Sequence, residues 1–110
     1  MPDAIPQYGL ILTTVPTRQE ADTIAHSLLS AQLAACVTLL PVHSIYTWQG
    51  AIHNDPEWQL LIKSRLDRFA ELEAKIRQLH SYDVPEIIAV PIVAGSEPYL
   101  QWISQQVKPT

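Results

Sequence analysis

The chain of 110 residues is the length of one domain with its own core, so we expect a single domain over residues 1–110. Hydrophobic residues make up 47% of it and charged residues only 16%, which favours a protein that covers part of its surface in an oligomer. A net charge of −4 with scattered lysines and arginines argues against nucleic acid as a partner, and no run of eighteen apolar residues is present to cross a membrane.

The first half of the chain predicts a strand, a helix and a second strand. Residues 8–15 are apolar and rich in β-branched side chains, which is typical of a mostly buried strand. Thr17 and Glu20 have the spacing of a capping box, and the apolar stripe that follows them predicts a helix. Residues 35–48 are expected to be extended, with Pro41 at an edge position or a bulge.

A long antiparallel arm is expected next. Gln49 and Gly50 mark its turn, and a third strand is predicted around Glu57 to Ser64, after the polar residues 54–56. The arm is larger than the core of so small a domain requires. We therefore expect it to pair with another copy of the same chain.

The rest of the chain predicts a helix, a strand and a last helix. Apolar residues from 66 to 79 repeat at helical spacing, with Asp67 as a cap, and Ser96 is expected to cap the final helix. Residues 87–93 form a nearly continuous apolar run, which predicts a central fourth strand. The order βαββαβ is the split βαβ arrangement of an α+β protein, whose sheet has one face that oligomerisation, a ligand or the last helix must cover.

The cysteine count and the start of the chain bear on location. Cys36 is the one cysteine and cannot close a disulfide within the chain. Residues 1–7 contain no lysine, arginine or long apolar run, so they do not resemble a signal peptide. We therefore expect a cytoplasmic protein.

Four blocks of sequence, taken in order and spacing, resemble the CutA family of divalent-cation tolerance proteins. They are residues 33–37 (LAACV), 45–50 (IYTWQG), 61–64 (LIKS) and 80–88 (HSYDVPEII), and residues 99–103 add a weaker fifth. The resemblance implies a ferredoxin-like βαββαβ sandwich with an extra C-terminal helix, assembled as a tight homotrimer similar to the PII signalling proteins. It also implies a role in tolerance of copper and other divalent cations, without catalysis.

The chain departs from this family where metal binding is concerned. Some members carry a cysteine at the position of Thr13 and a histidine pair where this chain has Leu79 and His80. A copper site built from those elements lacks its thiolate and one imidazole here. We therefore expect no required cofactor and at most weak binding of Cu²⁺ or another divalent cation, with His80 as the candidate ligand.

A ligand-binding cleft between subunits is expected to include Lys63, His80, Tyr82 and Glu86. Together these residues offer an ammonium, an imidazole, a phenol and a carboxylate, which suit an anionic or metal-chelated small molecule. The alternative is a salt bridge between Lys63 and Glu86, with Tyr82 capping the loop.

Trp48 and Cys36 are secondary candidates for the same cleft. The tryptophan is expected to pack at the subunit interface and to form a pocket wall. The cysteine is expected to pack as a small hydrophobe, with a role as ligand or nucleophile as the alternative. His43 and His53 lie on the arm, where a hairpin could bring two imidazoles together for a metal ion.

The expected function is therefore divalent-cation tolerance by a trimer that is not an enzyme. One alternative is a PII-like trimer that binds a signalling molecule at the intersubunit cleft. A second is an enzyme that uses Cys36 or His80 with Glu86 as an acid–base pair, although no HExxH or glycine-rich signature supports it. A third is a scaffold for another protein.

Overall fold

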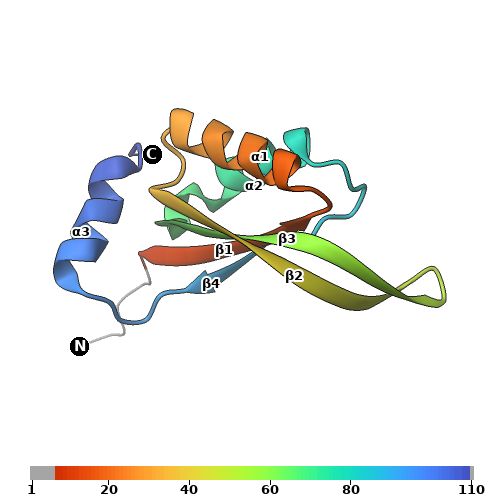
Figure 1. Cartoon of the computed structure of the whole chain (residues 1–110). Coiled ribbons are helices and arrows are strands. Elements are labelled where there is room, and N and C mark those ends of the chain that lie inside the picture. Colours follow the sequence, from red (N-terminus) through yellow and green to blue (C-terminus); the bar gives the residue numbers. More distant parts are fainter. Residues whose placement is uncertain (1–6, 110) are drawn as a thin grey trace.

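The computed structural model describes residues 7–109 and has the predicted α+β order (Figure 1). In chain order its elements are β1 (Tyr8–Val15), α1 (Arg18–Ser30), β2 (Cys36–Trp48), β3 (Ala51–Arg65), a 3₁₀ turn (Leu66–Arg68), α2 (Phe69–Leu79), β4 (Ile88–Pro91) and α3 (Glu97–Gln106). Within the described residues, no helix has the length and apolar character needed to cross a bilayer.

The four strands form one antiparallel sheet in the order β2-β3-β1-β4. Helices α1 and α2 lie side by side on one face of it (Figure 1). Alternate residues of β1 are buried against these helices because successive side chains of a strand point to opposite faces. The core comprises mainly Ile11, Val15, Ala21, Ile24, Leu28, Leu60, Ile62, Leu72 and Ile76. The predicted ferredoxin-like sandwich with an extra C-terminal helix is confirmed.

The arm is longer than predicted. Strand β3 is continuous from Ala51 to Arg65 and pairs with β2 as far as the turn, so the polar residues 54–56 belong to the strand. Strand β1 pairs with β3 only from Trp58 onward, and the rest of the ribbon therefore projects beyond the sheet (Figure 1). Gln49 and Gly50 both have positive φ, 50° and 81°, as a tight hairpin turn requires.

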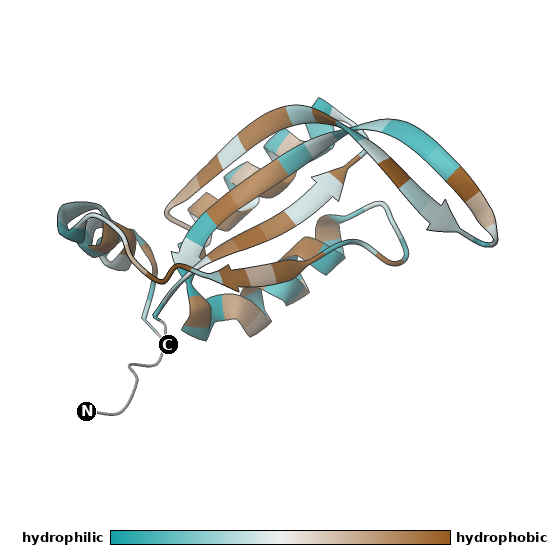
Figure 2. Ribbon diagram, turned by 90° about the horizontal axis from the view of Figure 1, so that it is seen from below, coloured by the Kyte–Doolittle hydropathy of each residue, from teal (hydrophilic) through white to brown (hydrophobic). Residues whose placement is uncertain are grey.

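The face of the sheet away from α1 and α2 is apolar. Figure 2 looks onto this face, and brown segments run along its strands. Ile88 and Val90 of β4 are 49% and 42% exposed there. The predicted central position of β4 is wrong, because β4 pairs with β1 alone and forms an edge. An apolar run indicates that a strand is to be covered, but it does not say whether a neighbouring strand or another surface covers it.

The predicted helix caps are found only in part. The Thr17 hydroxyl accepts a hydrogen bond from the Glu20 N–H at 3.2 Å, but the Glu20 carboxylate accepts from the Ser81 N–H instead of reaching back. Asp67 pairs with Arg65 at 3.0 Å and does not cap α2. Ser96 precedes α3 without a side-chain capping bond.

Helix α3 packs at the end of the sheet opposite the tip of the arm (Figure 1). Ile103 and Val107 form a small second core with Ala35. The Tyr8 and Ser104 hydroxyls share a hydrogen bond of 2.7 Å that joins β1 to α3. The helix therefore covers only one end of the sheet.

Candidate functional site

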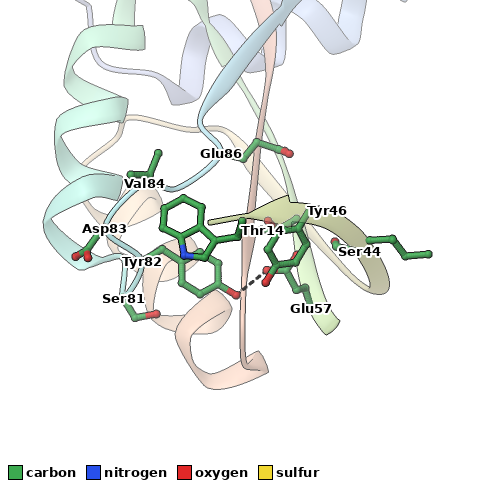
Figure 3. Close-up of a pocket in the computed structure, with 11 residues that line it drawn as sticks. Thr14, Ser44, Tyr46, Glu57, Ser81, Tyr82, Asp83, Val84 and Glu86 are labelled. Atoms are coloured by element: carbon green, nitrogen blue, oxygen red, sulfur yellow. Dashed lines mark hydrogen bonds between the residues drawn. The ribbon is translucent and has the colours of Figure 1, made fainter. Parts of the chain in front are cut away.

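An open pocket of about 710 Å³ lies at the base of the arm, within the size range of small-molecule sites. It forms where β2 and β3 leave the sheet beside the end of β1 and the loop between α2 and β4 (Figure 3). Its lining residues are Thr14, Ser44, Ile45, Tyr46, Trp48, Glu57, Ser81, Tyr82, Asp83, Val84 and Glu86.

A hydrogen-bonded pair, the partly exposed Tyr82 and the buried Glu57, joins the two sides of the pocket. The Tyr82 hydroxyl donates to Glu57 Oε2 at 2.6 Å, shown as the dashed line in Figure 3. Glu57 is only 6% exposed. Burial and the hydrogen bond to this carboxylate raise the pKa of Tyr82 well above its usual value of 10.0. The phenol therefore stays protonated and remains a donor at neutral pH.

His80 fastens the loop that carries Tyr82. Its side chain is fully buried; Nε2 lies 2.8 Å from the Thr14 carbonyl, and Nδ1 lies 3.1 Å from the Tyr82 N–H. Because a carbonyl only accepts and an N–H only donates, the proton is on Nε2 and Nδ1 is the acceptor. Both ring nitrogens are thus occupied, and this geometry leaves no lone pair free for a metal ion.

Tyr46 forms the opposite wall of the pocket. Its hydroxyl donates to Asp55 Oδ2 at 2.6 Å, and its ring stacks on His53 with the centroids 5.4 Å apart. The hydrogen bond to Asp55 is the main cause that raises the pKa of this phenol. These contacts hold the Tyr46 ring in place across the ribbon.

The structure divides the predicted cleft residues into two groups. Trp48, Tyr82 and Glu86 line the pocket, and His80 lies behind it as a support. Lys63 is opposite Cys36 in the strand pairing, where its Nζ lies 2.5 Å from Thr38 Oγ1 and 3.9 Å from the cysteine sulfur.

Lys63 is separated from the pocket because it lies six positions after Glu57 on β3, roughly 20 Å along an extended strand. No ion pair between Lys63 and Glu86 is present among residues 7–109, so the salt-bridge alternative is not found either. The expected convergence of all the cleft residues does not occur within one copy of the chain.

Metal ligands do not gather in the described part of the chain. His53 is opposite Tyr46 in the ladder, whereas His43 is opposite Pro56, three positions further along. An odd offset places the two imidazoles on opposite faces of the ribbon. No group of three His, Cys, Asp or Glu side chains within residues 7–109 is arranged to hold a metal ion.

Sequence reasoning did not select Glu57 or Tyr46. Glu57 is a single acidic residue in a strand, and nothing local distinguishes it from an exposed one. The one available signal for Tyr46 was its place in the block of residues 45–50, where only Trp48 was singled out.

Comparison with known proteins gives concordant matches. The family model of the CutA1 divalent ion tolerance protein matches residues 9–106. The divalent-cation tolerance protein CutA of Thermus thermophilus is 43% identical over 87% of this chain and 94% of its own length. The structure of the periplasmic divalent cation tolerance protein CutA from Archaeoglobus fulgidus superposes with a TM-score of 0.90 at 38% identity, covering 92% of this chain and 99% of that one.

The matches correct the predicted cytoplasmic location, which is wrong. The Archaeoglobus protein is described as periplasmic. An Arabidopsis thaliana relative, 38% identical over 90% of this chain and 55% of its own length, is described as chloroplastic. A chain with one cysteine forms no internal disulfide in any compartment, so the cysteine count could not report the location. The names of the Thermus and Archaeoglobus proteins describe tolerance and no catalytic activity.

Proposed function

The chain belongs to the CutA1 divalent ion tolerance protein family, and from that membership we propose that it supports tolerance of divalent cations, copper among them. The supporting observation is that the match runs from the second residue of β1 to the end of α3, so it includes nearly all of the sheet and the whole arm. A PII-like signalling role is not favoured, because the relatives are named for cation tolerance.

Growth under metal stress tests the proposal. Deletion of the gene in its own host is expected to lower the Cu²⁺ concentration at which growth stops, and the intact gene on a plasmid is expected to restore it. Equal growth of the deleted and complemented strains across Cu²⁺, Zn²⁺ and Co²⁺ would contradict the proposal.

The assembled form is a homotrimer under this proposal. The uncovered apolar face, the two edge strands β2 and β4, and Ile52 of the arm, which is 79% exposed, all favour burial against other copies. Sedimentation at micromolar concentration is expected to give three times the chain mass of 12.3 kDa. A stable monomer would contradict the trimer and leave the family assignment intact.

Direct Cu²⁺ binding is proposed to be weak and no catalytic step is proposed. The described residues offer no cluster of three metal ligands, and His80 has both nitrogens engaged. Calorimetric titration is expected to give heats that do not saturate at one Cu²⁺ per chain. Tight stoichiometric binding would show that ligands from several copies combine into a site.

A further inference from the structure

The pocket at the base of the arm carries negative charge that nothing in its lining balances. Glu57, Asp83 and Glu86 belong to the lining, which contains no lysine, arginine or histidine. The ion pairs among residues 7–109 all involve other carboxylates. A concave surface with charge of one sign attracts a ligand of the opposite sign.

The burial of Glu57 adds a free-energy cost to this unbalanced negative charge. A buried carboxylate is normally paired with a cation or a metal ion, because burial removes the water that would otherwise solvate its charge. Glu57 is 6% exposed, and its observed partner is the neutral hydroxyl of Tyr82. A positive group in the pocket would supply the missing partner.

The aromatic side chains indicate what kind of positive group fits. Tyr46, Trp48 and Tyr82 all line the pocket, and ring faces attract organic cations through their electron density. The hydroxyls of Tyr46 and Tyr82 are fixed on Asp55 and Glu57 at 2.6 Å each, which restrains both rings before any ligand arrives. Restraint of this kind lowers the entropy cost of binding.

A bare metal ion fits this pocket less well. Hard divalent cations such as Ca²⁺ and Mg²⁺ take six or more oxygen ligands, and softer ions such as Zn²⁺ take a compact set of nitrogen and sulfur ligands. No three candidate ligand side chains are close enough together in the part of the chain that the structure describes. Aromatic walls add nothing to such a coordination shell.

We propose that this pocket binds a small organic cation, with an alkylammonium group seated against the Glu57 carboxylate and the rings of Tyr46, Trp48 and Tyr82. This site is separate from the proposed role in metal tolerance. It differs from the anionic or metal-chelated ligand expected from the sequence, because Lys63 lies outside the pocket of a single copy.

Calorimetric titration of the full chain with tetramethylammonium tests the proposal, with tert-butanol as a neutral ligand of nearly the same shape. Tetramethylammonium is expected to bind the native protein roughly tenfold more tightly than the alcohol. Glu57→Gln keeps an acceptor for Tyr82 but removes the charge, and it is expected to abolish this preference. Glu97→Gln, on α3 and outside the pocket, is the matched control and is expected to leave it unchanged.

Two further variants keep the test decisive if Glu57→Gln fails to fold. Glu86→Gln, at an exposed lining position, is expected to weaken tetramethylammonium binding severalfold, and Trp48→Leu is expected to weaken it without affecting the alcohol. Equal affinity for both ligands, or no saturable binding by the native protein, would overturn the proposal. The second result is also expected if a basic side chain of another copy fills the pocket. Neither result bears on the growth assay, so failure here is distinguishable from failure of the tolerance role.

Discussion

Two buried hydroxyls on neighbouring strands predict opposite responses to removal. Thr13 on β1 and Ser64 on β3 both have no exposed surface. The Ser64 hydroxyl donates to the Leu33 carbonyl at 2.6 Å, whereas Thr13 Oγ1 has no hydrogen-bond partner in the described structure. An unpaired buried hydroxyl costs about 1–3 kcal/mol, and a methyl group of the same shape avoids that cost. Thr13→Val is therefore expected to raise the free energy of unfolding by about 1 kcal/mol.

Ser64→Ala is the matched comparison. It removes the donor and leaves the Leu33 carbonyl without this partner in a buried place, so the free energy of unfolding is expected to fall by about 1–3 kcal/mol. Urea unfolding followed by circular dichroism measures both variants, at one protein concentration because assembly shifts the apparent stability. If Thr13→Val lowers the stability as much as Ser64→Ala does, the Thr13 hydroxyl is paired and the reasoning fails.

Three further predictions concern single side chains. Tyr82 has a pKa raised above that of the unfolded chain by burial and by Glu57, so its contribution to stability is complete below about pH 10 and is lost as the pH rises above it. Tyr82→Phe is expected to be less stable than the native protein at neutral pH and to lose less of its free energy of unfolding as the pH rises above about 10, and equal losses in the two proteins would contradict this. Asp67 has a pKa lowered by Arg65, so its stabilising effect is present above about pH 4 and is lost in more acidic solution. In Asp67→Asn the fall in the free energy of unfolding with acid is expected to be smaller, by less than about 1 kcal/mol because the pair is exposed. Gly50→Ala places a side chain at φ 81° and is expected to cost about 1 kcal/mol in thermal unfolding, whereas no loss would mean that the turn rearranges.

The elements that could be predicted are those whose signals are local. Residues 8–15 alternate between the two faces of the sheet and match β1 residue for residue. The Thr17 cap is correct because a side chain three residues before an N–H can reach it without help from the rest of the fold. The start of β3 was misplaced because residues 54–56 are polar and include a proline, which is compatible with a strand only in an exposed two-stranded ribbon.

Of the two sides of the candidate site, the sequence predicted the loop side but not the side formed by the strands of the arm. Residues 80–86 are contiguous, so their grouping was visible in the sequence, and Tyr82 and Glu86 do line the pocket. The other side depends on strand register, which decides that Glu57 and not Lys63 stands opposite the loop. Exchanging one for the other reverses the charge of the pocket and therefore the class of ligand.

His80 shows why residue type alone does not assign a role. An isolated imidazole at the start of a loop suggests a metal ligand or a base, but both of its nitrogens bond to backbone groups of β1 and of its own loop. Such bonds fix the position of Tyr82, and through it the contact with the buried Glu57. The histidine therefore acts on the pocket at a distance, by holding the residue that lines it. Its removal should loosen the loop before it alters any metal binding, because the groups that lose their partners are the Thr14 carbonyl and the Tyr82 N–H.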